Sequence, residues 1–123
     1  GATRLNAPGR LPSTLGGERA VSVSAGGSAH SLAITAGGSV LSWGSGIYGR
    51  LGHGYEQNQL QPKKVAAFAD QRVNAVAAGV AHSLAITADG SIFAWGEGET
   101  GCLGHGEDRS NQLLPKSVEA WAQ

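Results

Sequence analysis

In short segments of the chain, larger side chains alternate with small or polar ones at a period of two residues. In the segment HSLAIT (residues 30–35), His30, Leu32 and Ile34 alternate with three smaller side chains. This period is typical of a β-strand, and a face of small side chains is expected where another sheet packs closely. No window shows a convincing helical period, so the pattern predicts an all-β protein.

Turn-forming residues separate the predicted strands. AGGS (residues 36–39) follows the first HSLAIT, and because Gly-Gly tolerates positive φ angles we expect a two-residue hairpin turn there. Residues 39–43 then form the returning strand, and residues 21–27 form the strand or strand edge that precedes HSLAIT. The Pro-x-x-Val segment at 62–65 is expected to be an outer edge strand, where the missing N–H of proline costs least. Each unit is therefore predicted to be a sheet of four antiparallel strands.

The same pattern occurs twice. The octet AHSLAITA spans residues 29–36 and 81–88, and further matches run from Val21/Val73 through Gly27/Gly79 to LGHG at 51–54 and 103–106. We divide the chain into the tail of a preceding repeat (1–19), a full repeat (20–71) and a nearly complete second repeat (72–123). A period near 50 residues is typical of propellers and solenoids.

One four-stranded sheet buries too little apolar surface to be stable alone. We expect stacked sheets to bury Leu32, Ile34, Trp43, Phe68 and their copies between them. A closed propeller needs about four blades or more, and this chain supplies about two, so we expect it to be part of something larger. The remaining blades would come from the rest of a longer parent chain or from self-association of copies of this one.

The two stretches AGGSAHSLAITAGGSVLSWGSGIYGRLGHG and AAGVAHSLAITADGSIFAWGEGETGCLGHG, each followed by Pro-x-x-Val, resemble the regulator of chromosome condensation repeat family over residues 8–121. The resemblance implies a seven-bladed β-propeller, of which this chain would form about two blades. WD-repeat propellers are a poorer match, because their repeat closes on Trp-Asp and this one closes on Trp-Gly.

Composition narrows the function further. The charges of the nine basic and nine acidic side chains cancel. The chain therefore has no net positive charge that would attract nucleic acid or an anionic membrane surface. Cys102 is the only cysteine, so no internal disulfide can form, and we interpret it as structural. With no signal peptide or membrane span in the sequence, we expect an intracellular protein, nuclear or cytoplasmic, with organellar targeting left open.

The histidines do not predict an active site or a metal site. His30 and His82 each precede a serine, but neighbouring residues on a strand point to opposite faces and cannot act as base and nucleophile. His53 and His105 lie 23 residues after them and lack short metal-ligand spacing. The glycine-rich loops lack the Gly-Lys-Ser/Thr of a phosphate loop. We therefore expect no catalytic residue, no metal and no cofactor. We interpret the histidines as structural.

Positions at which the two copies differ are the better candidates for function, because folding already explains the shared ones. They cluster in loops after Trp-Gly and after LGHG, and loops on a rigid scaffold commonly carry binding residues. We predict a partner-binding rim, apolar and aromatic in the first repeat and acidic in the second. Its candidate residues are Ile47, Tyr48, Arg50, Tyr55, Glu97, Glu99, Glu107 and Asp108.

The leading functional hypothesis is a protein-interaction scaffold. One alternative implied by the resemblance is an exchange factor for a small Ran-like GTPase, which would need no catalytic motif. Another is ultraviolet-B sensing, for which the family uses a Gly-Trp-Arg-His arrangement. The matching residues, 27–30 and 79–82, read Gly-Ser-Ala-His and Gly-Val-Ala-His, so both copies lack the tryptophan and the arginine.

Overall fold

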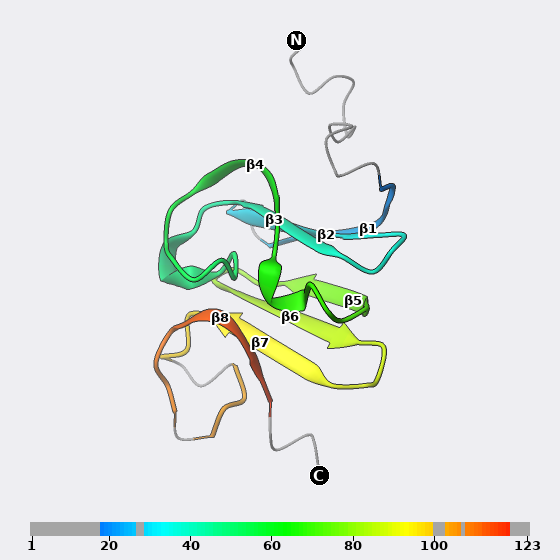
Figure 1. The fold of residues 1–123 in the computed structure, drawn as a ribbon. Coiled ribbons are helices and arrows are strands. Elements are labelled where there is room, and N and C mark those ends of the chain that lie inside the picture. The colour runs from blue at the N-terminus through cyan, green and yellow to red at the C-terminus, as the bar shows by residue number, and fades with distance from the viewer. Residues whose placement is uncertain (1–17, 27–28, 100–102, 107, 119–123) are drawn as a thin grey trace.

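The computed structural model describes residues 18–26, 29–99, 103–106 and 108–118. They form two stacked sheets of four antiparallel strands each, in chain order (Figure 1). The first sheet contains β1 (Ala20–Gly26), β2 (His30–Thr35), β3 (Val40–Gly44) and β4 (Gln59–Lys64). The second contains β5 (Val73–Ala78), β6 (His82–Thr87), β7 (Ile92–Gly96) and β8 (Gln112–Ser117). The prediction of an all-β partial propeller is confirmed.

The helical content of the described residues is limited to two single 3-10 turns, η1 (Ile47–Gly49) and η2 (Ala66–Phe68). The proline strands β4 and β8 lie at the outer edges, as predicted. The hairpin after β2 differs from the prediction. Thr35 and Ser39 close a three-residue connection, in which Gly38 alone has a positive φ, of 88°. A turn followed by one left-handed glycine is a common three-residue hairpin.

The alternation in HSLAIT builds the contact between the sheets. Leu32 and Ile34 of β2 face the second sheet, and Ala85 of β6 faces back toward them. The core cluster consists of Leu32, Ile34, Val40, Val65, Phe68, Val73, Ala85 and Trp95. Each large apolar side chain in it contributes roughly 1.5–3 kcal/mol by leaving water. The core therefore lies between the two blades.

The copies are not buried equally, although the sequence predicted that they would be. Trp95 is fully buried, whereas Trp43, which pairs with Ser31 on the other face of its sheet, is half-buried. Ile86, the copy of Ile34, is 41% exposed because it points away from the first sheet. Residue 121, the copy of Phe68, lies outside the described residues.

The lead-in strands align differently from the sequence match. Gly26 pairs with His30, and the Gly79 N–H donates to the His82 carbonyl, so Gly26 and not Gly27 is the counterpart of Gly79. A Cβ atom on Gly26 would lie 1.9 Å from the Gly79 carbonyl oxygen. Glycine is thus required there by the close approach of the two sheets.

Candidate binding rim

The loop after β3, residues 45–58, is held firmly at one end of the first sheet. Buried Ser42 donates to the Leu51 carbonyl (2.7 Å), and Asn58 Oδ1 accepts from the Gly46 N–H (2.9 Å). Tyr48, the middle residue of η1, has a φ of 67° and is the one non-glycine residue with positive φ in the described part of the chain. Such a conformation costs about 1–3 kcal/mol and persists only where the surrounding contacts enforce it.

Arg50 supplies much of that enforcement. Its Nε donates to the Ile47 carbonyl (3.0 Å), and its Nη1 reaches across to the Val80 carbonyl of the second repeat (2.9 Å). The guanidinium carbon lies 5.6 Å from the centre of the Tyr48 ring, a cation–π distance. Burial lowers the pKa of the guanidinium, which nevertheless stays charged.

The prediction grouped Arg50 with residues that contact a partner, but its side chain is buried. Arg50 therefore joins the two repeats and positions the loop, while its neighbours face solvent. Ile47 is 45% exposed, Tyr48 38% and Val80 73%. Val80 was missed as a rim residue, although the copies differ there, with Ser28 at the matching position.

Tyr55 belongs to a different part of the rim. Its ring lies 5.6 Å from Lys63 Nζ and 5.9 Å from the His53 ring, and its hydroxyl accepts from Gln59 Nε2 (3.4 Å). These contacts place Tyr55 against the outer strand β4. The structure thus separates it from the group formed by Tyr48 and Arg50, which contacts the loop before β6.

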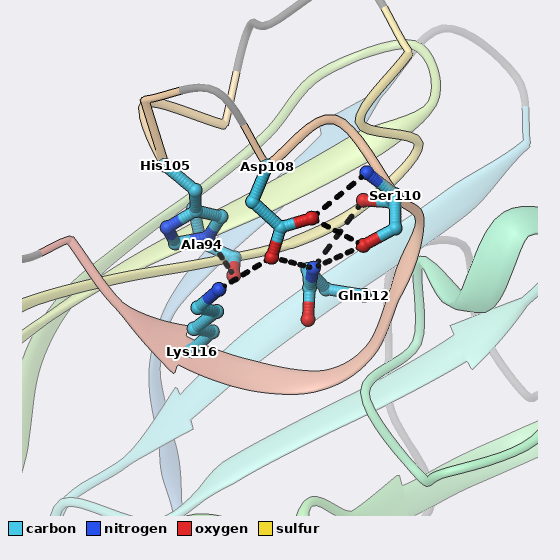
Figure 2. Close-up of polar contacts among 6 residues, drawn as sticks. All are labelled: Ala94, His105, Asp108, Ser110, Gln112 and Lys116. Carbon is cyan, nitrogen blue, oxygen red and sulfur yellow. Dashed lines mark hydrogen bonds and ion pairs between the residues drawn. The ribbon is translucent and has the colours of Figure 1, made fainter.

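The acidic candidates also have different surroundings. Glu99 is exposed, and Glu97 is half-buried, with its N–H bonded to the Ala81 carbonyl (3.0 Å). Glu107 lies outside the described residues. Asp108 is exposed but already engaged, as Figure 2 shows, through Lys116 Nζ (2.7 Å) and both the N–H and hydroxyl of Ser110.

The Lys116 hydrogen bond, followed by those from Ser110, holds the pKa of the Asp108 carboxyl well below its usual range. His105, drawn in the same view, has its Nε2 3.4 Å from the Ala94 carbonyl oxygen. Asp108 and His105 thus bond to residues of their own repeat. Of the described acidic candidates, Glu97 lies next to the loop of Val80, through its N–H bond to the Ala81 carbonyl.

A histidine and a serine do meet in this structure, but from different repeats. His30 Nε2 lies 2.9 Å from Ser83 Oγ, and the Ser83 hydroxyl donates to the Arg50 carbonyl (2.8 Å). Because a hydroxyl has one proton, the imidazole must donate to the serine, which is the reverse of a general base. Both side chains are buried, so the pair is structural.

Burial, followed by the positive charge of Arg50, lowers the pKa of His30 to about 4. Burial, followed by Lys63, also lowers the pKa of His53, whose Nε2 lies 3.0 Å from Ser42 Oγ. Both histidines are therefore neutral at pH 7. His30, predicted to be a hydrogen-bonded histidine, thus has Ser83 as its partner.

No group of three potential metal ligands comes together among the described residues. Residue 102, interpreted above as a structural cysteine, lies outside them. Within the same part of the chain, no helix has the length and apolar character needed to cross a membrane.

Comparison with family models identifies the repeats. The model "Regulator of chromosome condensation (RCC1) repeat" matches residues 37–86 and 89–122, and a second model of the same description matches residues 20–50 and 73–102. The matches to the second model fall once on each sheet, whereas the 37–86 match of the first model runs from β3 and β4 of the first sheet into β5 and β6 of the second.

Curated relatives are much longer than this chain. The human E3 ubiquitin-protein ligase HERC2 is 43% identical over 93 residues, which are 76% of this chain and 2% of HERC2. The ultraviolet-B receptor UVR8 of Arabidopsis thaliana is 45% identical over 92 residues, which are 75% of this chain and 21% of UVR8.

Solved structures show the same fold. Yeast RCC1 (Prp20), in its crystal structure with Kap60, has a TM-score of 0.75 at 26% identity, covering 88% of this chain and 26% of that one. Human WBSCR16 has a TM-score of 0.69 at 28% identity, covering 80% of this chain and 26% of that one. A further crystal structure of Prp20p from Saccharomyces cerevisiae, described with its binding to Gsp1p and histones, has a TM-score of 0.71 at 25% identity, with coverages of 88% and 26%.

Proposed function

The chain belongs to the regulator of chromosome condensation (RCC1) repeat family, and from this premise we propose that its two blades bind a protein partner through the rim. The observation that carries the proposal is the exposed apolar group of Ile47, Tyr48 and Val80. Buried Arg50 holds the loops of this group together across two repeats. Exposed apolar groups on a rigid frame are favoured binding anchors.

Variants of the rim test this proposal. The partners named for the yeast neighbour, Gsp1p, histones and Kap60, are suitable probes for isothermal titration calorimetry. We expect Ile47→Ser combined with Tyr48→Ser to weaken binding of the recognised partner at least about ten-fold, as loss of a binding anchor does. Leu60→Ser, at a 95% exposed position on β4, is the matched control and should leave the affinity unchanged. Equal affinities of the rim variant and the parent chain would refute the proposal.

The acidic half of the rim needs its own experiment. Reversing Glu97 and Glu99 to lysine should weaken binding of a basic partner, most clearly at low salt, because screening hides exposed charges at high salt. Unchanged affinity at low salt would restrict the binding surface to the apolar group.

Nucleotide exchange on a small GTPase is a second candidate, supported by the fold shared with a protein that binds Gsp1p. Such an activity distorts a bound nucleotide's pocket and requires no catalytic side chains. Release of a fluorescent nucleotide from Gsp1p, with and without the chain, separates the two proposals. Binding without accelerated release would favour a scaffold.

Ultraviolet-B sensing receives no support from these repeats. Gly79 and His82 are present, but Val80 and Ala81 stand between them where the sensing arrangement has tryptophan and arginine. The similarity to UVR8 therefore concerns the scaffold.

A further inference from the structure

Arg50 is a buried cation with no counter-ion in the described part of the chain. Its side chain is 6% exposed, and no carboxylate of the described residues lies within ion-pair distance of it. The one ion pair in that part of the chain joins Asp108 and Lys116. Removing a charge from water is unfavourable unless an opposite charge or enough hydrogen bonds offset the loss.

Hydrogen bonds satisfy only part of the Arg50 guanidinium. Nε donates to the Ile47 carbonyl and Nη1 to the Val80 carbonyl, which uses two of the five N–H groups that a guanidinium carries. The buried side-chain polar atoms without a partner in the described residues are His30 Nδ1 and Trp95 Nε1. Arg50 Nη2 makes neither of the two bonds and is not one of these atoms, so its N–H groups stay in reach of solvent.

This positive charge is not a shared feature of the two repeats. The segment GRLGHG at residues 49–54 matches GCLGHG at residues 101–106, and the two differ only at Arg50 and Cys102. Because the repeats keep every other residue of this segment, the repeat pattern itself does not require a cation at this position. Arg50 is therefore a candidate for recognition as well as for support of the loop.

The surface around the guanidinium is apolar. The Tyr48 ring lies 5.6 Å from the guanidinium carbon, and the side chains of Tyr48, Ile47 and Val80 are all exposed. A partner that covers these side chains excludes water from Arg50 and lowers the local dielectric constant. An ion pair with Arg50 is then stronger than one at an open surface.

Acidic side chains on the adjoining loop limit what the partner can carry. Glu97 lies next to the Val80 loop through its N–H bond to the Ala81 carbonyl, and Glu99 follows two residues later. These carboxylates would repel a run of acidic residues. A single acidic residue with apolar neighbours is the complement of this surface.

We propose that the rim binds its partner protein through one acidic side chain of that protein, whose carboxylate accepts hydrogen bonds from Arg50 Nη2. Apolar residues beside this carboxylate pack on Ile47, Tyr48 and Val80. The inference rests on the proposed function, because it names the chemistry of the residue that the same rim recognises.

Nuclear magnetic resonance titration of the chain with two short peptides tests the proposal. The peptides are Leu-Glu-Leu and Leu-Gln-Leu, both acetylated and amidated, and they differ only in the charge of the central residue. Leu-Glu-Leu should shift the Arg50 Nε–H signal and the backbone amides of residues 47–50 and 79–81. It should bind at least about ten-fold more tightly than Leu-Gln-Leu, because hydrogen bonds between charged groups are the stronger ones.

A pair of variants assigns this preference to Arg50. Arg50→Gln should abolish the preference for the acidic peptide. Lys63→Gln removes an exposed cation from β4 of the same repeat and should preserve it. Circular dichroism verifies that each variant is folded, and the comparison of the two peptides on the parent chain needs no variant.

Three results would overturn the proposal: equal affinities of the two peptides, no shift at the rim with either, or saturation by inorganic phosphate at a lower concentration than by Leu-Glu-Leu. Equal binding of both peptides at the rim would leave the proposed function standing, because the apolar group alone would then account for the contact. The two proposals can therefore fail separately.

Discussion

His30 of the first sheet and Ser83 of the second are joined by a buried hydrogen bond, with 2.9 Å between Nε2 and Oγ. The Ser83 hydroxyl in turn donates a hydrogen bond to the Arg50 carbonyl, so one short chain of polar groups connects β2, β6 and the rim loop. The same loop places Ile47 and Tyr48 in solvent and, through the Arg50 side chain, holds Val80 beside them. The inter-blade contact and the candidate binding surface are thus mechanically linked.

Removing the serine hydroxyl tests this link. Ser83→Ala leaves both the His30 Nε2–H and the Arg50 carbonyl buried without a partner, which should cost about 2 kcal/mol or more of unfolding free energy. Ser31→Ala replaces the matching serine of the other repeat. Ser31 is half-buried, so this change should cost less than about 0.5 kcal/mol. Urea unfolding followed by tryptophan fluorescence measures both. Equal losses would show that the inter-blade bond adds nothing.

The stability of the fold should depend on pH through His30. Its pKa is about 4 in the folded chain and 6.5 without that environment, so the unfolded state takes up a proton first as the pH falls. The resulting loss begins near pH 6.5, is complete below about pH 4 and amounts to about 3 kcal/mol. His30→Gln, which retains an N–H donor, should flatten this part of the profile. A parallel profile for that variant would contradict the assignment.

Replacement by alanine should destabilise the fold more at Gly52, in the first LGHG sequence, than at its copy Gly104 in the second. A Cβ atom on Gly52 would lie 2.8 Å from Trp95 Nε1, whereas one on Gly104 would lie 3.4 Å from Val118 Cγ1. Both have positive φ, so Gly104→Ala reports the backbone strain alone, about 1–2 kcal/mol. Gly52→Ala should lose a further 1 kcal/mol or more through overpacking. Thermal unfolding of the two variants measures this difference.

Arg50 should control the order of the rim loop. Lysine cannot span both carbonyl acceptors with a planar fork, so Arg50→Lys should cost about 1.5–3 kcal/mol and loosen the loop. Amide hydrogen exchange should rise in residues 45–50 and 79–81 while β2 and β6 stay protected. Exchange that rises equally in all strands would indicate a general loss of stability and not a local clamp.

Much of the fold follows from local pattern. The two-residue period of HSLAIT, the glycine turns and the proline edge strands are local signals, and they determined the strand order and the all-β architecture. Strand alternation also excluded a base–nucleophile pair between His30 and Ser31, because side-chain direction on a strand depends only on the backbone.

Only the tertiary structure decided which copy of each repeated residue is buried. Identical letters in the two repeats have different neighbours, since burial depends on what packs against a face and not on the residue itself. That is why Trp95 is enclosed and Ile86 is exposed, and why His30 meets Ser83 from the other repeat. The same long-range packing turned Arg50 from an expected contact residue into the internal support of Tyr48 and Val80, because its carbonyl partner lies 30 residues away along the chain.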